Sequence, residues 1–360
     1  MYTFAMRLIA FDGRYLINRR NGLGVDSASF LSFFQTLGCE IVIFGFNDQI
    51  DELRNLYPNY EIRNLGFKLL AIASSIFKPN LTLRDCDVVF LSQVHPVRFY
   101  RNNEILFIIR IHDLFPFTHP KFFTLKSRVA FALGMSHLTV RDLVVSNSWY
   151  TYHELLRIKW EKFHDNRALV VYCKVETTES IQCQNCTVCC NGLPEQDYFL
   201  SIGTNEPRKN LESLLSVWSK KDIPQQLVIV SNHGWKEIRF ERYSDSKIRV
   251  MDDLCENAID RLYSSSVGYI SVSLDEGFDI PAVQATLYSL PVIVSDIPVH
   301  REMLSDYEYT YWLDDSQSNI LPILKEIQAI SLPTQYPPNR PIEAWTRHVS
   351  ELFAYFLKMK

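Results

Sequence analysis

Short apolar runs recur along this chain, and each is followed by a loop and then by a segment with the period of a helix. Leu8–Phe11 is such a run; a loop at residues 12–24 and a helix-like stretch at Ser27–Leu37 separate it from the next one. Strand, loop, helix and strand in this order predict a parallel sheet with crossover helices. The strands expected in the front half are Leu8–Phe11, Ile41–Phe44, Asp87–Leu91, Leu106–Ile111 and Leu143–Val145.

The same order of elements returns in the second half. Tyr198–Ile202 is predicted as a strand, residues 203–208 as a loop and Asn210–Ser219 as a helix. The later strands are expected at Leu227–Val230, Gly268–Val272 and Pro291–Val294. This repetition predicts an α/β fold with two Rossmann-like lobes and a cleft between them.

A polar, cysteine-rich stretch without periodicity, residues 173–196, is predicted as the linker between the lobes. It would separate a front domain at residues 1–172 from a rear domain at residues 197–335. Residues 336–360 are expected to contain a last amphipathic helix, Ile342–Leu357, that packs back on the front domain.

Composition and charge exclude several classes of protein. With 360 residues, 47% of them hydrophobic and 22% charged, the chain can bury a sizeable core. A net charge of -4 argues against a general nucleic-acid binder. The charge is uneven, because residues 1–170 hold 20 Lys/Arg against 15 Asp/Glu and residues 171–360 hold 17 against 26. The two lobes are therefore expected to have different partners.

Hydropathy predicts a cytoplasmic protein without a transmembrane helix. No apolar run approaches the roughly 18 residues that span a bilayer, and the first residues lack the features of a signal peptide. The eight cysteines would be reduced there. Two aromatic-basic segments, Pro96–Arg101 and His119–Arg128, suggest peripheral contact between the front lobe and the anionic inner face of the plasma membrane. A solvated face is the alternative interpretation.

The most informative stretch is Ser271–Gln284. It runs from a strand end through a turn at Gly277 into a helix with Pro281 at its first position. Backbone N–H groups at such a helix start suit a diphosphate, and open α/β sheets bind ligands at this edge. Glu276 could accept hydrogen bonds from sugar hydroxyls, and Gln284 is on the same side. The alternative is a tight turn in which Glu276 is a solvated acid.

Several segments carry a resemblance to a known family. EGFDIPAVQ at residues 276–284 resembles the EGFGLPxLE segment of the retaining glycosyltransferases of family 4, which have the GT-B fold. SIGTNEPRKNL at residues 201–211 resembles VGTLEPRKNL, and IHDLFPFTHP at residues 111–120 resembles VHDLIPxxHP. The HDLFP and EPRKN forms are similar to bacterial mannosyltransferases of O-antigen and polysaccharide synthesis. The resemblance therefore implies GDP-mannose as the donor and a lipid-linked saccharide as the acceptor.

The resemblance also implies roles for residues of the rear lobe. Arg208 and Lys209 would neutralise the diphosphate of the nucleotide sugar, whose departing charge a glycosyl transfer must stabilise. Glu276 would position the transferred sugar together with the backbone of Gly277 and Phe278. Gln284 stands where the family has a Glu that holds the ribose, and its amide oxygen can still accept a hydrogen bond.

Other implied positions surround the donor. His112, at the end of a strand in the front lobe, would approach the reacting sugar; a satisfied structural histidine is the alternative. Three glycines, Gly22, Gly24 and Gly203, would let loop backbone approach the donor or, for the first two, the acceptor. The segment with Gly22 and Gly24 could equally be a flexible turn.

In the implied mechanism the departing phosphate would deprotonate the acceptor hydroxyl. It needs neither a cofactor nor a metal ion, because Arg208, Lys209 and the helix start near Pro281 would do the electrostatic work of a metal. Four cysteines, Cys183, Cys186, Cys189 and Cys190, have a spacing compatible with zinc or an iron–sulfur cluster, but a plain cysteine-rich linker is the favoured interpretation.

Two departures from the family pattern leave other functions open. Asp279 replaces a Gly and would add unfavourable negative charge beside the phosphates, and Gln284 replaces a Glu. A hydrolase or epimerase of nucleotide sugars, and a catalytically silent homologue that acts as a binding partner, are the alternatives.

Overall fold

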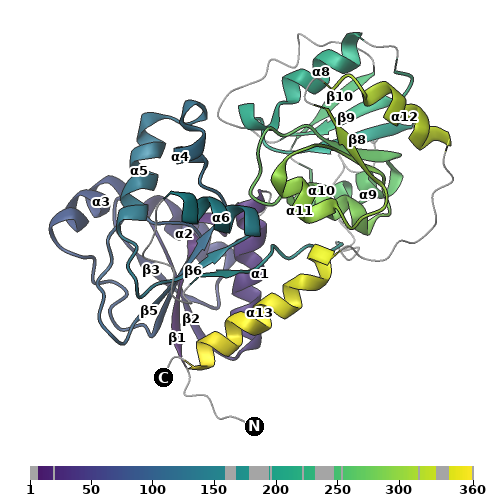
Figure 1. Ribbon diagram of the computed structural model, residues 1–360. Helices are drawn as coiled ribbons and strands as arrows, with labels where there is room; N and C mark the ends of the chain where they lie inside the picture. The colour runs from purple at the N-terminus through teal and green to yellow at the C-terminus, as the bar shows by residue number, and fades with distance from the viewer. Residues whose placement is uncertain are drawn as a thin grey trace. The chain divides into compact units, whose positions relative to one another are not determined.

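A computed structural model of the chain describes residues 7–18, 21–158, 168–177, 194, 197–220, 223–231, 247–252, 254–314, 317–329 and 340–358. Two compact units divide the chain (Figure 1). Unit 1 comprises residues 1–172 and 348–360, and unit 2 comprises residues 173–347. Cys183, Cys186, Cys189 and Cys190 fall outside the described residues.

Unit 1 is built on a seven-stranded sheet in which every described pairing is parallel. Its strands, in spatial order, are β3 (Glu61–Asn64), β2 (Glu40–Gly45), β1 (Leu8–Asp12), β4 (Val88–Leu91), β5 (Leu106–Ile111), β6 (Leu143–Ser146) and β7 (Ala168–Val170). The helices of this unit are α1 (Gly22–Thr36), α2 (Ile50–Leu56), α3 (Lys68–Phe77), α4 (Phe115–Thr118), α5 (Leu125–Ser136) and α6 (Trp149–Arg157). The predicted parallel sheet with crossover helices is confirmed.

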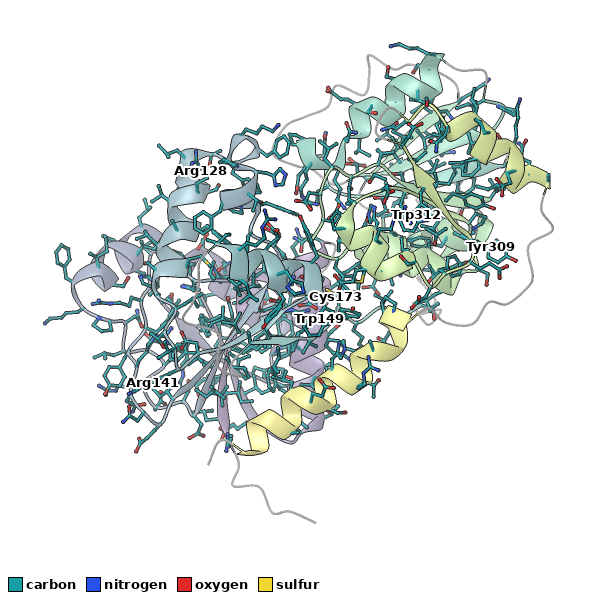
Figure 2. All side chains as sticks on the ribbon, in the orientation of Figure 1. Arg128, Arg141, Trp149, Cys173, Tyr309 and Trp312 are labelled. Atoms are coloured by element: carbon teal, nitrogen blue, oxygen red, sulfur yellow. The ribbon has the colours of Figure 1, made fainter. Side chains whose placement is uncertain are left out.

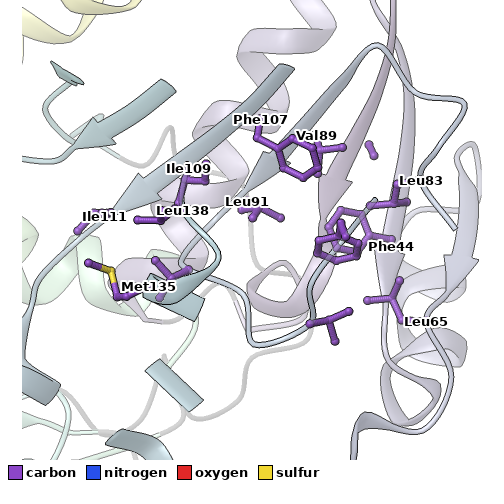
Figure 3. Close-up of a cluster of buried hydrophobic side chains, with 14 of the residues drawn as sticks. Phe44, Leu65, Leu83, Val89, Leu91, Phe107, Ile109, Ile111, Met135 and Leu138 are labelled. Atoms are coloured by element: carbon purple, nitrogen blue, oxygen red, sulfur yellow. The ribbon is translucent and has the colours of Figure 1, made fainter. Parts of the chain in front are cut away.

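The core of unit 1 explains why its inner strands are apolar along their whole length. All six residues of β5 are buried, as expected where helices cover both faces of a parallel sheet. Figure 3 shows side chains of β4 and β5, among them Leu91 and Ile109, beside Met135 of α5. These residues belong to one buried cluster.

Helix α1 begins five residues before the expected start at Ser27. Asn21 is its N-cap, and the Asn21 side chain accepts a hydrogen bond of 2.7 Å from the Gly24 backbone N–H. Gly22 and Gly24 therefore lie in the first turn of a helix and not in a loop, which corrects the prediction. The glycines carry no side chain to continue the apolar period, so periodicity alone placed the start too late.

Unit 2 contains a six-stranded sheet, again parallel in every described pairing. Its strands, in spatial order, are β10 (Ile248–Met251), β9 (Gln226–Val230), β8 (Tyr198–Ile202), β11 (Gly268–Ser271), β12 (Val292–Ser295) and β13 (Thr310–Leu313). Its helices are the 3-10 turn η5 (Pro207–Lys209), α8 (Leu211–Lys220), α9 (Glu256–Ser265), α10 (Ile280–Leu287), α11 (Pro298–Leu304) and α12 (Ile320–Ala329).

The last helix, α13 (Arg340–Lys358), includes the predicted segment Ile342–Leu357. Its residues from His348 onward group with unit 1, where the His348 ring contacts the ring of Tyr172. Within the part of the chain that the structure describes, no helix combines the length and apolar character needed to cross a bilayer.

Candidate functional site

The candidate site of unit 2 begins at the turn that follows β8. The backbone N–H of Gly203 donates to the Val230 carbonyl at 3.0 Å, and η5 then carries Arg208 and Lys209. The Leu274 N–H donates to the Arg208 carbonyl at 2.7 Å, which ties this turn to the loop after β11. Because β8 and β11 are neighbours in a parallel sheet, the two loops leave from the same edge.

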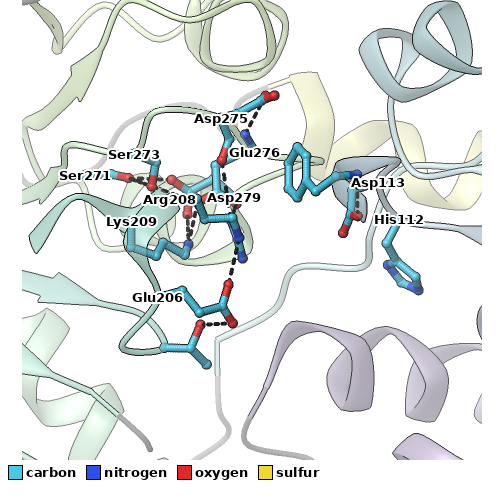
Figure 4. A network of polar contacts seen from close by, with 12 residues as sticks. His112, Asp113, Glu206, Arg208, Lys209, Ser271, Ser273, Asp275, Glu276 and Asp279 are labelled. Carbon is cyan, nitrogen blue, oxygen red and sulfur yellow. Dashed lines mark hydrogen bonds and ion pairs between the residues drawn. The ribbon is translucent and has the colours of Figure 1, made fainter. Parts of the chain in front are cut away.

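Glu276 holds both cations of this turn. Its Oε2 lies 2.5 Å from Arg208 Nη1, and its Oε1 lies 2.6 Å from Lys209 Nζ. Figure 4 shows the two basic side chains directed at the carboxylate. Glu276 is only 4% exposed and Lys209 9%. The alternative of a solvated acid is therefore wrong for Glu276, and the structure brings Arg208, Lys209 and Glu276 together as the sequence pattern required.

Neighbouring polar groups fix Glu276 and Arg208 in place. The Ser273 hydroxyl donates to Glu276 Oε1 at 2.7 Å, and the Glu276 N–H donates to Asp275 Oδ1 at 2.8 Å. Arg208 Nε donates to Glu206 Oε2 at 2.8 Å. Charge-assisted contacts of this kind hold a side chain in one geometry.

The protonation states of the site follow from burial and charge together. Burial disfavours the charged ammonium of Lys209, but Glu276 and Asp279 outweigh it and raise the pKa of Lys209 above its ordinary value. Burial likewise disfavours the Glu206 carboxylate, but Arg208 outweighs it and lowers the pKa of Glu206. Lys209 is therefore charged and Glu206 ionised at neutral pH.

Asp279 lies beside Lys209, as expected, but other groups compensate its carboxylate. Its Oδ1 is 3.7 Å from Lys209 Nζ, and its Oδ2 accepts from the Ser271 hydroxyl at 2.6 Å. The same Oδ2 lies 3.0 Å from His300 Nε2. The backbone of Asp279 is left-handed, with φ 63°, a conformation that glycine adopts most easily. The Gly that Asp279 replaces in the family segment fits this geometry.

Gly203 leaves room for the lysine side chain. A Cβ at this position would lie 3.3 Å from Lys209 Cε and 3.4 Å from Cδ. Gly203 thus acts by letting Lys209 pass close to the backbone on its way to Glu276.

Gln284 and the start of α10 complete the site in unit 2. Asp279 is the N-cap of this helix, so Pro281 occupies its second position and not its first. Gly277 and Phe278 are buried in the loop before it. The Gln284 Nε2 donates to the Glu176 carbonyl at 3.2 Å, a contact that an ionised Glu could not make. Among the described residues, Gln284 Oε1 has no partner and remains an acceptor.

We expect Gln284→Glu to lower the thermal stability of unit 2. The new carboxylate would face the Glu176 carbonyl, so a hydrogen bond worth about 1 kcal/mol is replaced by repulsion between two acceptors. Thermal unfolding followed by circular dichroism would measure the fall in Tm. An unchanged or higher Tm would show that the contact does not contribute.

His112 belongs to unit 1 and follows β5. Its Nε2 lies 3.1 Å from the Ser92 carbonyl, which can only accept, so Nε2 carries the proton and Nδ1 a lone pair. Burial lowers the pKa of His112 to about 4, with Asp26 opposing the shift and Arg110 adding to it. His112 is therefore neutral at physiological pH, and its ring can accept a hydrogen bond from a hydroxyl but cannot supply a charge.

Sequence reasoning missed three contributors to these networks: Ser273, His300 and Asp26. Asp26 forms a bidentate ion pair with Arg110, at 2.8 Å and 2.9 Å. His300 lies in α11, 21 residues after the Asp279 that it contacts. Ser273 lies within the stretch Ser271–Gln284 that the sequence analysis selected, but its type gave no reason to single it out. Asp26 and His300 contact residues that are distant in the sequence, so no local pattern marks those two.

One family model matches the chain. It is described as "Glycosyl transferases group 1", and it matches residues 191–327, which include both loops of the candidate site.

Curated relatives match parts of the chain. The O-antigen chain mannosyltransferase RfbU of Salmonella typhimurium is 28% identical over 232 residues, which cover 62% of this chain and 60% of RfbU. The O-antigen chain mannosyltransferase B of Escherichia coli is 24% identical over 215 residues, 55% of each chain. The chain thus spans about three fifths of the length of the first of these relatives.

Solved structures match the fold over nearly the whole chain. Anabaena HepE, crystallised with UDP and glucose, gives a TM-score of 0.66 at 12% identity and covers 98% of this chain and 100% of its own. WaaG, a glycosyltransferase of lipopolysaccharide biosynthesis, gives 0.64 at 12% identity, with 96% and 94% covered. These neighbours confirm the predicted GT-B fold.

Proposed function

We propose that this chain, whose residues 191–327 match the family model described as "Glycosyl transferases group 1", is a hexosyltransferase that uses a nucleotide-sugar donor and retains the anomeric configuration. The observation that carries the proposal is the placement of Arg208 and Lys209 on Glu276 at one edge of the sheet of unit 2. Two fixed cations beside a carboxylate offer both the charge that a diphosphate needs and the acceptor that sugar hydroxyls need.

In the proposed reaction the bond between sugar C1 and the diphosphate oxygen breaks, and a bond from the acceptor oxygen to C1 forms on the same face. The acceptor proton passes to the departing phosphate oxygen. Arg208 and Lys209 stabilise the negative charge that grows on the leaving group. In this proposal Arg208 and Lys209 stabilise the leaving group by themselves, so no metal ion and no cofactor take part.

The remaining site residues have supporting roles in the proposal. Glu276 positions the transferred sugar, aided by the backbone of Gly277 and Phe278. Gln284 accepts a ribose hydroxyl through Oε1, and Gly203 admits the Lys209 side chain. His112 accepts a hydroxyl of the sugar through Nδ1. Gly22, in the first turn of α1, presents its backbone N–H to the donor or acceptor, and Gly24, whose N–H is bound by Asn21, lets the backbone approach the same molecule.

We further propose mannose as the transferred sugar, GDP-mannose as the donor and a growing lipid-linked surface glycan as the acceptor. The similarity to O-antigen mannosyltransferases supports this choice. HepE has the same fold and was crystallised with UDP and glucose. The fold therefore does not determine the base of the donor nucleotide, and the test below compares two donors.

Incubation with GDP-mannose or UDP-glucose and a synthetic lipid-linked saccharide tests the function. We expect GDP release that depends on acceptor, and NMR of the product should show an α-mannoside, the configuration of the donor. A β-linked product would contradict retention. Free mannose released without acceptor would favour a hydrolase, and no donor binding would favour a silent homologue.

A surface of unit 1 supports the proposed contact with a membrane. Six large apolar side chains on and beside α3 are between 49% and 86% exposed: Phe67, Leu69, Leu70, Ile76, Phe77 and Leu81. We call this set the α3 surface. Residues 66–84 contain no acidic residue but carry the exposed cations Lys68, Lys78 and Arg84. Exposed apolar groups among positive charges fit an anionic bilayer surface.

The two segments suggested by the sequence differ in exposure. In Pro96–Arg101, Val97 and Phe99 are buried and Arg101 pairs with Asp142, so this segment offers little surface. His119–Arg128 exposes Leu125 at 71% and its basic residues, including Arg128 (Figure 2). We therefore assign the proposed membrane contact to the α3 surface and to His119–Arg128.

We expect the double variant Lys68→Glu/Lys78→Glu to bind anionic vesicles at least about tenfold more weakly, because each basic residue near the surface contributes about 1 kcal/mol. Sedimentation with phosphatidylglycerol vesicles measures the binding, with phosphatidylcholine vesicles as the lipid control. Lys220→Glu, at the exposed end of α8, is the matched control variant. Equal sedimentation of the double variant and the native chain would contradict the assignment.

A further inference from the structure

His300 is a fully buried histidine whose two ring nitrogens both face oxygen atoms. Its Nδ1 lies 2.8 Å from the Ser295 backbone carbonyl, and its Nε2 lies 3.0 Å from Asp279 Oδ2. A carbonyl oxygen only accepts hydrogen bonds, and so does an ionised carboxylate.

Asp279 is ionised. Burial opposes its charge, but the Lys209 ammonium and the Ser271 hydroxyl act against burial, and the pKa of Asp279 lies well below its ordinary value. The Ser271 hydroxyl also donates to this carboxylate. Asp279 therefore has no proton to offer to His300.

Within the described part of the chain, no hydroxyl near the ring supplies a proton either. The Ser295 hydroxyl is 3.4 Å from His300 Nδ1, but it donates to the Ser273 carbonyl at 2.5 Å. A neutral imidazole has a single N–H. At one of its two contacts an unprotonated ring nitrogen would then face an oxygen atom, and no hydrogen bond would form there. The doubly protonated ring satisfies both contacts.

We infer that His300 is a buried imidazolium that positions the Asp279 carboxylate and, through it, Lys209. Asp279 uses Oδ2 for His300 and turns Oδ1 toward Lys209 Nζ, 3.7 Å away. His300 is thus a third positive charge behind the two cations of the proposed donor site. Its effect on donor binding rests on the proposed function.

The charges of the cluster show why a third cation matters. Among the groups that form ion pairs in this cluster, the carboxylates of Glu206, Glu276 and Asp279 are matched by Arg208, Lys209 and a protonated His300. With a neutral His300 the cluster would carry a net negative charge, which opposes the binding of a diphosphate. The charge on His300 therefore compensates the carboxylate that Asp279 adds to this site.

The other titratable groups around this pair leave that balance unchanged. Tyr263 from α9 and Tyr269 from β11 face Asp279, and burial raises the pKa of both well above the ordinary value, so both are neutral. Asp296, before α11, forms its own ion pair with Arg301.

Nitrogen-15 NMR of the imidazole rings tests the protonation state without any donor. The spectrum of the native chain at pH 7, with the His300 signals assigned by their loss in His300→Gln, should show protons on both His300 nitrogens. A single protonated nitrogen would overturn the inference, even if the chain transfers mannose as proposed.

A compensating pair of variants tests the link to the donor. We expect His300→Gln to weaken GDP-mannose binding at least about tenfold by calorimetry, because Asp279 then lacks its countercharge. Adding Asp279→Gly, which suits the left-handed backbone at that position, should restore affinity to within about threefold of the native chain. A double variant that binds GDP-mannose as weakly as His300→Gln would overturn the positioning role.

Absence of GDP-mannose binding to the native chain would instead reject the proposed donor, and the NMR result would still decide the protonation state of His300.

Discussion

Replacement of Lys209 by alanine is expected to lower kcat/KM for mannosyl transfer by at least about 100-fold, the range seen when one preorganised group that stabilises developing charge is removed. Lys209 is buried, positively charged and held 2.6 Å from Glu276. Its ammonium is therefore in place before the leaving group develops charge.

The fold should survive this substitution. Glu276 keeps its contacts with Arg208 and Ser273, and Asp279 keeps Ser271 and His300. The far-ultraviolet circular dichroism of the Lys209→Ala variant should match that of the native chain. Lys220→Ala, in exposed surface at the end of α8, is the matched control and should keep full activity. A Lys209→Ala variant with native rates would reject the role of this lysine.

Replacement of Asp26 by alanine is expected to lower the free energy of unfolding of unit 1 by about 3–5 kcal/mol, as for other buried ion pairs that lose one partner. Asp26 and Arg110 are 1% and 0% exposed and form two hydrogen bonds. Arg110 also donates to the Ser146 and Val171 carbonyls, so the pair connects α1 to three neighbouring segments of the sheet.

The matched control is Asp51→Ala on α2. Asp51 pairs with Arg54 at 3.5 Å, but its side chain is 95% exposed, so its removal should change stability by less than about 0.5 kcal/mol. Urea unfolding of both variants, followed by tryptophan fluorescence and circular dichroism, makes the comparison. Equal midpoints for Asp26→Ala and Asp51→Ala would contradict the importance of the buried pair.

The sequence predicted the inner strands of both sheets but not their edges. The missed strands β3 and β7 flank the sheet of unit 1, and β10 and β13 flank that of unit 2. Edge strands are covered on fewer sides, so half-buried or polar residues suffice there; β3, for example, has the sequence Glu-Ile-Arg-Asn. The edge strand β7, Ala-Leu-Val, is apolar but only three residues long, so it was missed for its length and not for its polarity.

The resemblance to a known family predicted that Arg208, Lys209 and Glu276 share one site. The structure supplies the physical reason, because β8 and β11 are neighbouring parallel strands and the loops that leave them lie at one edge of the sheet. The partners Asp26 and His300 depend on packing between distant segments, and such contacts leave no local pattern in a sequence. The left-handed backbone at Asp279 could not be predicted for a different reason. Glycine is the usual sequence sign of a positive φ, and this position has Asp instead.

Calorimetric titration of GDP-mannose into the native chain and into Lys209→Ala tests most directly whether these side chains grip the donor diphosphate. We predict saturable binding to the native chain and affinity at least about tenfold lower for the variant, since loss of one cation from a buried anion site costs more than 1.4 kcal/mol. Equal affinities in the two titrations would contradict the account.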